Sequence, residues 1–458
     1  MSIISAVGQA DDTVLLSNDI YSLFYLLKLS STVFCEKSLV DLCAEKTVLQ
    51  VFKNRNWSPQ NNLMDVNPIK INDKPIPFSI NAEHVGVLRS SEGNLPSITA
   101  RFAAHRRALS SILHTGLAYR HRGNPSYNVR IEKLYATPVL LSGLGTLVLK
   151  KSKLDMIDRH FSNTLCRLLK LHDKTPRCVT HFLAGTLPAS ALLHMRQVSL
   201  YSMICRLKNN ELYLHAYHLF SNGSPHRSSW FHQIDVICKM YSLPNPIYML
   251  DHPPQKNTFK IYVKKKIISY WELKLRDEAQ KLKSLRFFKP QYMSLTKPHP
   301  LFVTAGSSPD KSRMACIQAK MLSGRYRCES LVQYWVSSSN GLCQLSPLCN
   351  EHEDIGHILQ RCSALNPTRS NLMEHTMKVM ETLPEPTRSL IMMYCDPNSS
   401  MFCQFLLDCS ALPNVVSAVQ IYGFQYVLLP LFDIARTWTF VLHRERLKLL
   451  ARWKLVRD

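Results

Sequence analysis

Acidic residues are scarce in this sequence of 458 residues. Asp and Glu number 33 against 56 Lys and Arg, which leaves a formal net charge of +23. An excess of this size favours a polyanionic partner or an acidic surface, and nucleic acid is the commonest such partner. A soluble protein that is merely basic is the alternative.

The sequence also lacks the features of membrane and secreted proteins. No run of about 18 uninterrupted apolar residues is present, because Pro430, Asp433 and Arg436 interrupt the best candidate, residues 427–442. The first residues contain no charged segment followed by an apolar core, as a secretory signal would. The 14 cysteines are irregularly spaced and do not suggest a disulfide framework. We therefore expect a soluble protein of a reducing compartment that is not secreted and has no membrane partner; nucleus and cytoplasm both stay open.

The basic residues are spread along the chain in small clusters. This distribution suits a long surface that follows a phosphate backbone. Two arginines and a tyrosine at 325–327 suit phosphate contact combined with base stacking, although a solvated helix end would contain the same residues. The candidate nucleic-acid contacts are Arg101, Arg106, Arg107, Arg325, Tyr326 and Arg327, and further clusters are Arg120 and Arg122, Lys264 to Lys266, and Arg444, Arg446 and Lys448.

An acidic pair stands between two apolar segments near the N-terminus. Residues 5–17 read Ser-Ala-Val-Gly-Gln-Ala-Asp-Asp-Thr-Val-Leu-Leu-Ser, a pattern typical of a β-hairpin with Asp11 and Asp12 at its tip. Two carboxylates at a tight turn can present oxygen ligands to a pair of Mg²⁺ ions, which stabilise an in-line phosphoryl displacement. A solvated turn is the alternative explanation.

The rest of the chain predicts a mixture of strands and helices. Asn18 or Asp19 can cap a helix whose apolar face is Ile20, Leu23, Phe24 and Leu27. Residues 46–52 and 69–80 are typical of extended segments, and residues 97–206 are periodic as in helices, with breaks near Pro125, Pro176 and Pro188. Residues 207–310 are rich in proline, which predicts irregular connections around one or two helices.

Four residues between 343 and 362 have the chemistry of metal ligands. Cys343, Cys349, His357 and Cys362 follow the spacing C-x5-C-x7-H-x4-C, which lets three thiolates and one imidazole close a tetrahedral Zn²⁺ site. The first gap is longer than usual for such sites, and His352 is a competing ligand. Buried free cysteines with a surface histidine are the alternative.

Several segments resemble one protein family. Residues 9–17 are similar to the aromatic-Ala-Asp-Asp motif of reverse transcriptases, in the version found in non-LTR (LINE-type) retrotransposons, with Gln9 where the family has an aromatic residue. Glu45-Lys46-Thr47 resembles the next motif of the polymerase palm, and residues 82–89 resemble the segment between palm and thumb. Residues 93–96 and 142–145 resemble thumb sequences, and the similarity extends with varying strength over nearly the whole chain.

This resemblance implies an RNA-directed DNA polymerase that takes an RNA template, a DNA target or primer, and dNTPs. Asp11 and Asp12 would be catalytic Mg²⁺ ligands, Lys46 would lie near the triphosphate, and the Cys/His element would follow the thumb. The alternative is a non-catalytic RNA- or DNA-binding protein derived from a retrotransposon.

The expected fold class is α+β, a palm remnant followed by a mainly helical thumb and C-terminal region. The expected domains are the C-terminal half of a palm at 1–90, a helical thumb at 91–210, a basic connection at 211–335, a zinc-knuckle-like element at 336–366 and a helical region at 367–458.

We predict that this chain alone has no polymerase activity. A palm polymerase needs a further metal-binding aspartate that normally precedes this hairpin, and only ten residues stand before Asp11, so we expect a fragment or a degenerate gene. The measurement is dNTP incorporation on a primed RNA template with Mg²⁺ or Mn²⁺. Primer extension above that of an Asp11→Ala control would contradict this prediction.

Overall fold

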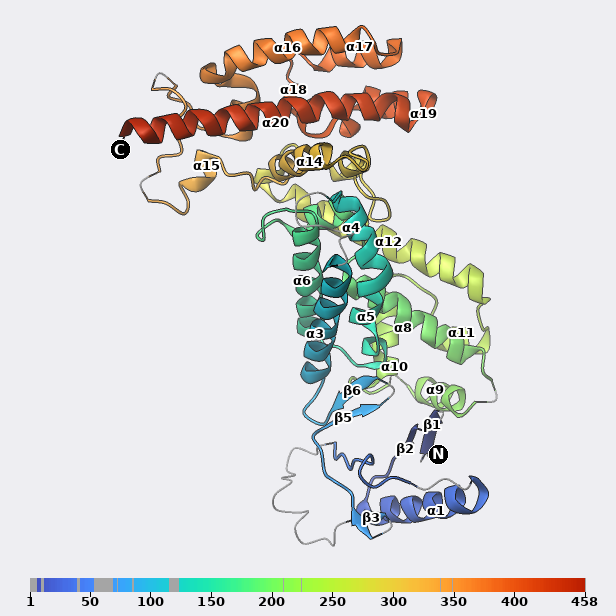
Figure 1. The fold of residues 1–458 in the computed structure, drawn as a ribbon. Helices are drawn as coiled ribbons and strands as arrows, with labels where there is room; N and C mark the ends of the chain where they lie inside the picture. The colour runs from blue at the N-terminus through green and yellow to red at the C-terminus, as the bar shows by residue number, and fades with distance from the viewer. Residues whose placement is uncertain are drawn as a thin grey trace. The chain divides into compact units, whose positions relative to one another are not determined.

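The computed structural model describes residues 6–9, 12–38, 42–52, 69–71, 73–84, 86–114, 123–208, 210–223, 225–337, 339–347 and 349–457. In these residues the fold is α+β, with many helices and three small antiparallel sheets of two strands each (Figure 1). The chain forms two compact units, each built from three stretches of sequence. The first unit comprises 1–107, 137–157 and 189–267, and the second comprises 108–136, 158–188 and 268–458.

The predicted N-terminal hairpin is present in the first unit. Strand β1 (Ala6–Gln9) pairs with β2 (Asp12–Leu15), and Gln9 stands opposite Asp12. Asp11 lies outside the described residues, and the side chain of Asp12 is not described either. The other two sheets pair β3 (Lys70–Ile71) with β4 (Lys74–Pro75) and β5 (Asn81–His84) with β6 (Val87–Ser90).

The helix after the hairpin begins where the sequence predicted. In α1 (Ile20–Ser38), Asp19 caps the N-terminus because its Oδ1 accepts a hydrogen bond from the backbone N–H of Ser22 at 2.8 Å. Its expected apolar face is only partly covered, since Phe24 is 51% exposed.

The strand predicted at 46–52 is wrong. Lys46 ends a turn over residues 44–46, and the backbone N–H and Oγ1 of Thr47 both donate to the carbonyl of Cys43, at 3.0 and 2.8 Å. These bonds curl the chain, so a strand cannot begin at Lys46. Extended pairing is limited to one bridge between Leu49 and Phe78.

The helices of the first unit pack around α8, which contacts α9, α10 and α11. Helices α3, α6 and α12 have residues in both units. The bounds are α3 (Leu95–Ile112), α5 (Thr137–Leu141), η3 (Leu144–Thr146), α6 (Lys151–Leu168), α8 (Ala189–Cys205), α9 (Glu211–Ser221), α10 (Trp230–Met240), α11 (Pro246–Asp251) and α12 (Lys256–Gln280).

The prediction of an irregular region at 207–310 is also wrong, because most of these residues are helical. Several of its prolines begin helices, whereas others lie in the connections between them. Pro246 is in the first turn of α11, and the side chain of Asn245 caps that helix by accepting from the N–H of Ile247. Proline is tolerated there because its missing N–H would have had no partner within the helix. Pro300 and Pro309 begin two further helices in the same way.

Helix α20 (Phe424–Arg457) is central to the C-terminal part of the second unit, where it packs against α14, α16, α17, α18 and α19. The other elements of this unit are α4 (Pro125–Ile131), η2 (Glu132–Ala136), α7 (Arg177–Ala184), η4 (Lys283–Leu285), η5 (Pro290–Tyr292), α13 (Pro300–Val303), α14 (Pro309–Leu322), α15 (Glu329–Val332), η6 (His357–Arg361), η7 (Ser363–Leu365), α16 (Asn366–Met380), α17 (Glu385–Tyr394), α18 (Phe402–Asp408), η8 (Cys409–Ala411) and α19 (Pro413–Tyr422).

Pro430 lies inside α20 and cannot donate to the carbonyl of Tyr426 one turn earlier. The hydroxyl of Thr387, from α17, donates to that carbonyl at 3.0 Å instead. Thr387 is 1% exposed, so a side chain from a neighbouring helix replaces the missing backbone bond in the interior of the unit.

One segment, Phe402–Tyr422, is long and apolar enough to cross a membrane by length and composition alone, with a mean hydropathy of 1.4. It comprises α18, η8 and α19, and 61% of it is buried within the protein. A buried segment of the core has the same composition, so this finding is weak evidence for a membrane span.

Asn124 is a buried polar residue whose side chain joins two segments of the second unit by hydrogen bonds. Its Oδ1 accepts from the N–H of Ser126 at 2.9 Å and caps α4, while its Nδ2 donates to the carbonyls of Phe302 and Gly306 at 2.8 and 2.6 Å. Asn124 is 3% exposed, so water cannot easily replace these bonds.

We predict that Asn124→Ala lowers the free energy of unfolding by about 2–4 kcal/mol, because it removes a helix cap and two further hydrogen bonds. Asn124→Ser keeps a capping oxygen and should lose less. Denaturant unfolding of the three proteins measures the difference. Equal stability of the parent and the Ala variant, or no advantage of Ser over Ala, would refute the assignment.

Candidate metal centre

The loop that carries the first two cysteines is closed by backbone pairing. Leu342 and His352 form an antiparallel bridge, and the N–H of Cys343 donates to the carbonyl of Glu351 at 2.8 Å. The chain between them therefore doubles back, and a turn in which the N–H of Cys349 donates to the carbonyl of Ser346 returns Cys349 toward Cys343. The long first gap of the motif is accommodated by this loop.

The other two candidate ligands lie at the two ends of the short helical segment η6. His357 begins it, and its N–H is capped by Oδ1 of Asp354 at 2.6 Å. Cys362 follows its last residue, and the N–H of Cys362 donates to the carbonyl of His357 at 2.8 Å. This wide turn places the thiol and the imidazole on the same side of the segment.

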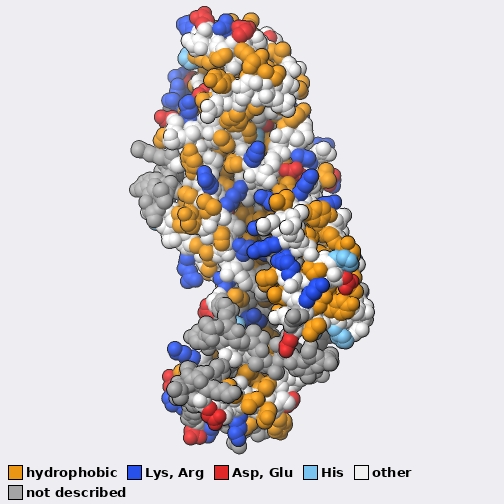
Figure 2. All heavy atoms as spheres, turned by 90° about the vertical axis from the view of Figure 1, so that its right-hand side faces the viewer, with side chains coloured by type: hydrophobic (Ala, Val, Ile, Leu, Met, Phe, Trp, Pro, Cys, Tyr) orange, Lys and Arg blue, Asp and Glu red, His pale blue; other side chains and the backbone are white. Residues whose placement is uncertain are grey.

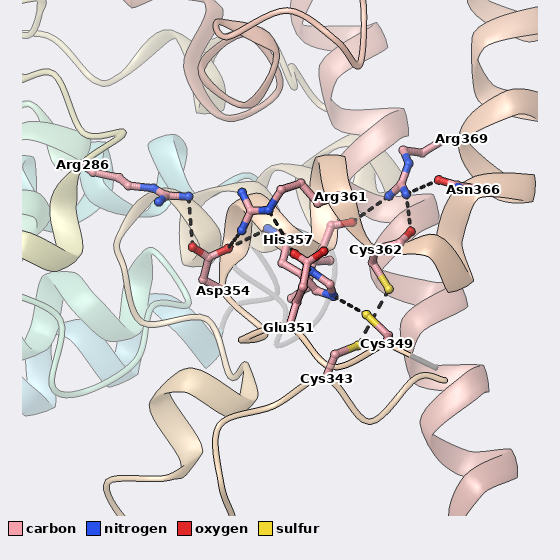
Figure 3. A network of polar contacts seen from close by, with 11 residues as sticks. Arg286, Cys343, Cys349, Glu351, Asp354, His357, Arg361, Cys362, Asn366 and Arg369 are labelled. Atoms are coloured by element: carbon pink, nitrogen blue, oxygen red, sulfur yellow. Dashed lines mark hydrogen bonds and ion pairs between the residues drawn. The ribbon is translucent and has the colours of Figure 1, made fainter. Parts of the chain in front are cut away.

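The four side chains converge, as Figure 3 shows. Their ligand atoms all lie within 4.8 Å of one another. The Sγ atoms of Cys343 and Cys362 are 3.8 Å apart, and Sγ of Cys349 lies 3.5 Å from Nε2 of His357. A tetrahedral Zn²⁺ with Zn–S of about 2.3 Å and Zn–N of about 2.0 Å would require separations of about 3.8 and 3.5 Å. The cluster can therefore hold a metal ion such as zinc.

Burial closes the cluster to solvent. The two cysteines of the loop are 7% and 9% exposed, and His357 and Cys362 are fully buried. Four protein ligands in a buried tetrahedron leave no open coordination position for a substrate. His352, the competing ligand considered above, is exposed and does not belong to the cluster.

A second set of residues orients the histidine. Nδ1 of His357 lies 3.1 Å from Oε2 of Glu351. A proton on Nδ1 donated to this carboxylate leaves the Nε2 lone pair directed at the sulfur atoms, an arrangement common around metal-binding histidines. Arg361 bridges Glu351 and Asp354, at 3.4 and 3.2 Å, and Arg286 contacts Asp354 at 3.3 Å.

The thiols influence one another's protonation. A hydrogen bond with Cys362, together with burial, raises the pKa of Cys343. The same hydrogen bond, with a further contribution from His357 and against the effect of burial, lowers the pKa of Cys362 to about 4. The pocket therefore favours a thiolate at Cys362, the form that binds metal.

The arginines of α3 that were predicted to contact nucleic acid differ in their exposure to solvent. Arg106 and Arg107 are exposed, whereas Arg101 is half-buried and donates to the carbonyl of Gly86 at the turn between β5 and β6. Lys46 is exposed in its turn. Arg120 and Arg122 lie outside the described residues.

The prediction that Tyr326 stacks on a base is wrong. Tyr326 is 5% exposed, and its hydroxyl hydrogen-bonds Nδ1 of His443 in α20 at 2.6 Å. Burial raises the pKa of Tyr326 to about 12. Its flanking arginines differ, since Arg325 is half-buried and Arg327 is exposed. Two arginines beside a tyrosine suggested an open surface, but the ring packs against α20.

Three buried ionic residues near the metal centre were missed from the sequence. Glu353 accepts two hydrogen bonds from Arg446, at 2.9 and 2.7 Å. Arg369 donates to the carbonyls of Ile358 and Cys362 and so holds the end of η6. Arg446 was expected in a basic cluster with Arg444 and Lys448, but it is 4% exposed. The residues around Arg446 do not indicate that its partner, Glu353, lies 93 residues earlier in the chain.

Comparison with known proteins identified no relatives. No protein-family model, no curated protein and no solved structure matches this chain.

We predict one Zn²⁺ per chain, bound through Cys343, Cys349, His357 and Cys362. Thiolate and imidazole ligands favour Zn²⁺ over Mg²⁺ or Ca²⁺. Metal analysis of the purified protein should find zinc in the parent and little in the Cys349→Ser and His357→Ala variants.

The control for this measurement is Cys238→Ser, which removes a buried cysteine of the first unit and should keep its zinc. Glu351→Ala should weaken zinc binding by about 10–100-fold, because it removes the partner that orients His357. If the parent contains no zinc, or if the Cys349→Ser and His357→Ala variants bind as much zinc as the parent, the four residues do not form a zinc site.

Proposed function

We propose that this chain is part of an RNA-directed DNA polymerase of a non-LTR retrotransposon. Its substrates would be dNTPs, an RNA template and a DNA target or primer. Nucleotide transfer would use two Mg²⁺ ions, with Asp11 and Asp12 among their ligands. The observation that carries this proposal is the N-terminal hairpin.

The register of the hairpin supports a metal-binding turn. Gln9 pairs with Asp12, so Asp12 takes the first position of the second strand. Asp11 precedes it in the sequence and lies outside the described residues. Carboxylates at such adjoining positions supply the hard oxygen ligands that Mg²⁺ prefers.

The order of elements after the hairpin also agrees with the proposal. A helix capped by Asp19 follows β2, and exposed Lys46 comes after it, free to contact a triphosphate. The helices α3, α4, α5, α6, α7 and α8 occupy the region that the resemblance assigns to the thumb.

The metal centre would have a structural role in this protein. Zn²⁺ would supply four ligand bonds that join the Cys343–Cys349 loop to η6, and the closed geometry leaves the ion no catalytic position. Around it, exposed Arg327 would be held where it can meet a phosphate group.

A non-catalytic nucleic-acid-binding protein is the second candidate function. The observation that favours it is the combination of a closed metal centre with exposed basic residues, because neither feature requires polymerisation. Both candidates bind nucleic acid, so an activity assay has to separate them.

The deciding experiment measures primer extension on an RNA template by the chain, alone and joined to any reading frame found directly upstream of it. We expect extension that disappears in the Asp11→Asn and Asp12→Asn variants, because each removes a metal ligand. Asp19→Asn, which keeps a capping oxygen for α1, is the matched control and should remain active. Nucleic-acid binding without extension in the joined protein would favour the second candidate.

A further inference from the structure

Helix α12 has a buried side and a basic side. In its first half, Phe259, Val263 and Ile267 recur every fourth residue and are 8%, 4% and 0% exposed. This spacing places them in one buried line along the helix. The residues between them are exposed, apart from the half-buried Lys266.

Lysines recur at the exposed positions of this half of the helix, beside the buried line. No acidic residue occurs between Lys256 and Trp271. Lys260 and Lys264 continue the line that Lys256 begins, at about 6 Å intervals along the helix axis. Four of the lysines in this half of the helix are exposed, and Lys266 is half-buried. We call the following residues the α12 lysines: Lys256, Lys260, Lys264, Lys265 and Lys266.

These lysines make no ion pair among the residues that the structure describes. By contrast, Lys239 pairs with Asp235 at 2.6 Å, and Lys281 and Lys378 also bind acidic residues four positions earlier. Like charges on neighbouring turns repel one another. A group of this kind costs stability in the free protein, and a polyanion would relieve that cost.

Aromatic side chains lie on the chain just before and among these lysines. The rings of Tyr248 and His252 are stacked, with centroids 4.6 Å apart and planes inclined by 10°, and Tyr248 is 56% exposed. Tyr262 is 39% exposed, with the ammonium of Lys266 5.7 Å from its ring centroid. Exposed rings beside a basic line are typical of proteins that bind single strands.

Figure 2 views the protein from the side on which α12 lies in Figure 1, and shows Lys and Arg side chains gathered there with hydrophobic ones between them. Asp251 is the one acidic residue from 246 to 271. The surface is thus strongly positive without being purely polar.

We propose that the α12 lysines bind the phosphate backbone of single-stranded nucleic acid, while Tyr248 and His252 stack against its bases. The inference rests on the proposed function only in that both require nucleic-acid binding. An anionic membrane fits less well, because a helix lying in a membrane surface inserts its apolar face, and that face of α12 is buried in the protein.

The test is fluorescence anisotropy of the full chain with labelled single-stranded RNA, single-stranded DNA and a duplex, across a salt series. One variant combines Lys260→Gln, Lys264→Gln and Lys265→Gln. Its control combines Lys239→Gln, Lys281→Gln and Lys378→Gln, which removes the same charge from paired lysines. We expect the first variant to lose about two units of the slope of log affinity against log salt, and the control to lose much less.

Tyr248→Ala should weaken single-strand binding by about fivefold or more through lost stacking, and leave duplex binding unchanged. Equal losses in the two triple variants, or a Tyr248→Ala variant that binds single strands as the parent does, would overturn the proposal. A first triple variant that no longer binds phosphatidylserine vesicles but keeps the RNA affinity of the parent would also overturn the proposal. If the parent binds no nucleic acid at all, the proposed function fails as well.

Discussion

The buried ion pair between Glu353 and Arg446 joins the metal centre to the longest helix of the second unit. The two residues are 0% and 4% exposed, and the same carboxylate also accepts from the N–H of Glu329 at the start of α15. Glu353 follows His352, whose bridge to Leu342 closes the cysteine loop. Removing one member of such a pair leaves a buried charge, at a cost of about 3–5 kcal/mol. The loop, α15 and α20 therefore depend on one carboxylate.

The large positive charge of the chain has two physically different parts. Arg369, Arg436 and Arg446 are buried, and each donates hydrogen bonds to carbonyl or carboxylate groups of the protein. These arginines hold helices together and are not available to a partner. The α12 lysines, of which only Lys266 is half-buried, are exposed and make no ion pair among the described residues. Net charge alone predicts a polyanionic partner, but burial decides which cations can meet it.

The candidate metal centre was the most predictable site, because ligand type and spacing are local properties. Cys349, His357 and Cys362 already had suitable spacing, and the doubtful member was Cys343. Its place in the cluster follows from the bridge between Leu342 and His352, a pairing that residue spacing does not reveal. The same bridge leaves His352 exposed, which decides between the two competing ligands.

The sequence by itself determined the elements that depend on near neighbours. The β1–β2 hairpin, a cap of α1 at Asn18 or Asp19 and the helix breaks near Pro125 and Pro176 follow from turn chemistry within a few residues. Only the tertiary structure decided burial. Tyr326 lies against α20, 117 residues later in the chain, so its ring is unavailable to a base. A local pattern records what a side chain is, whereas its exposure depends on segments that the pattern does not contain.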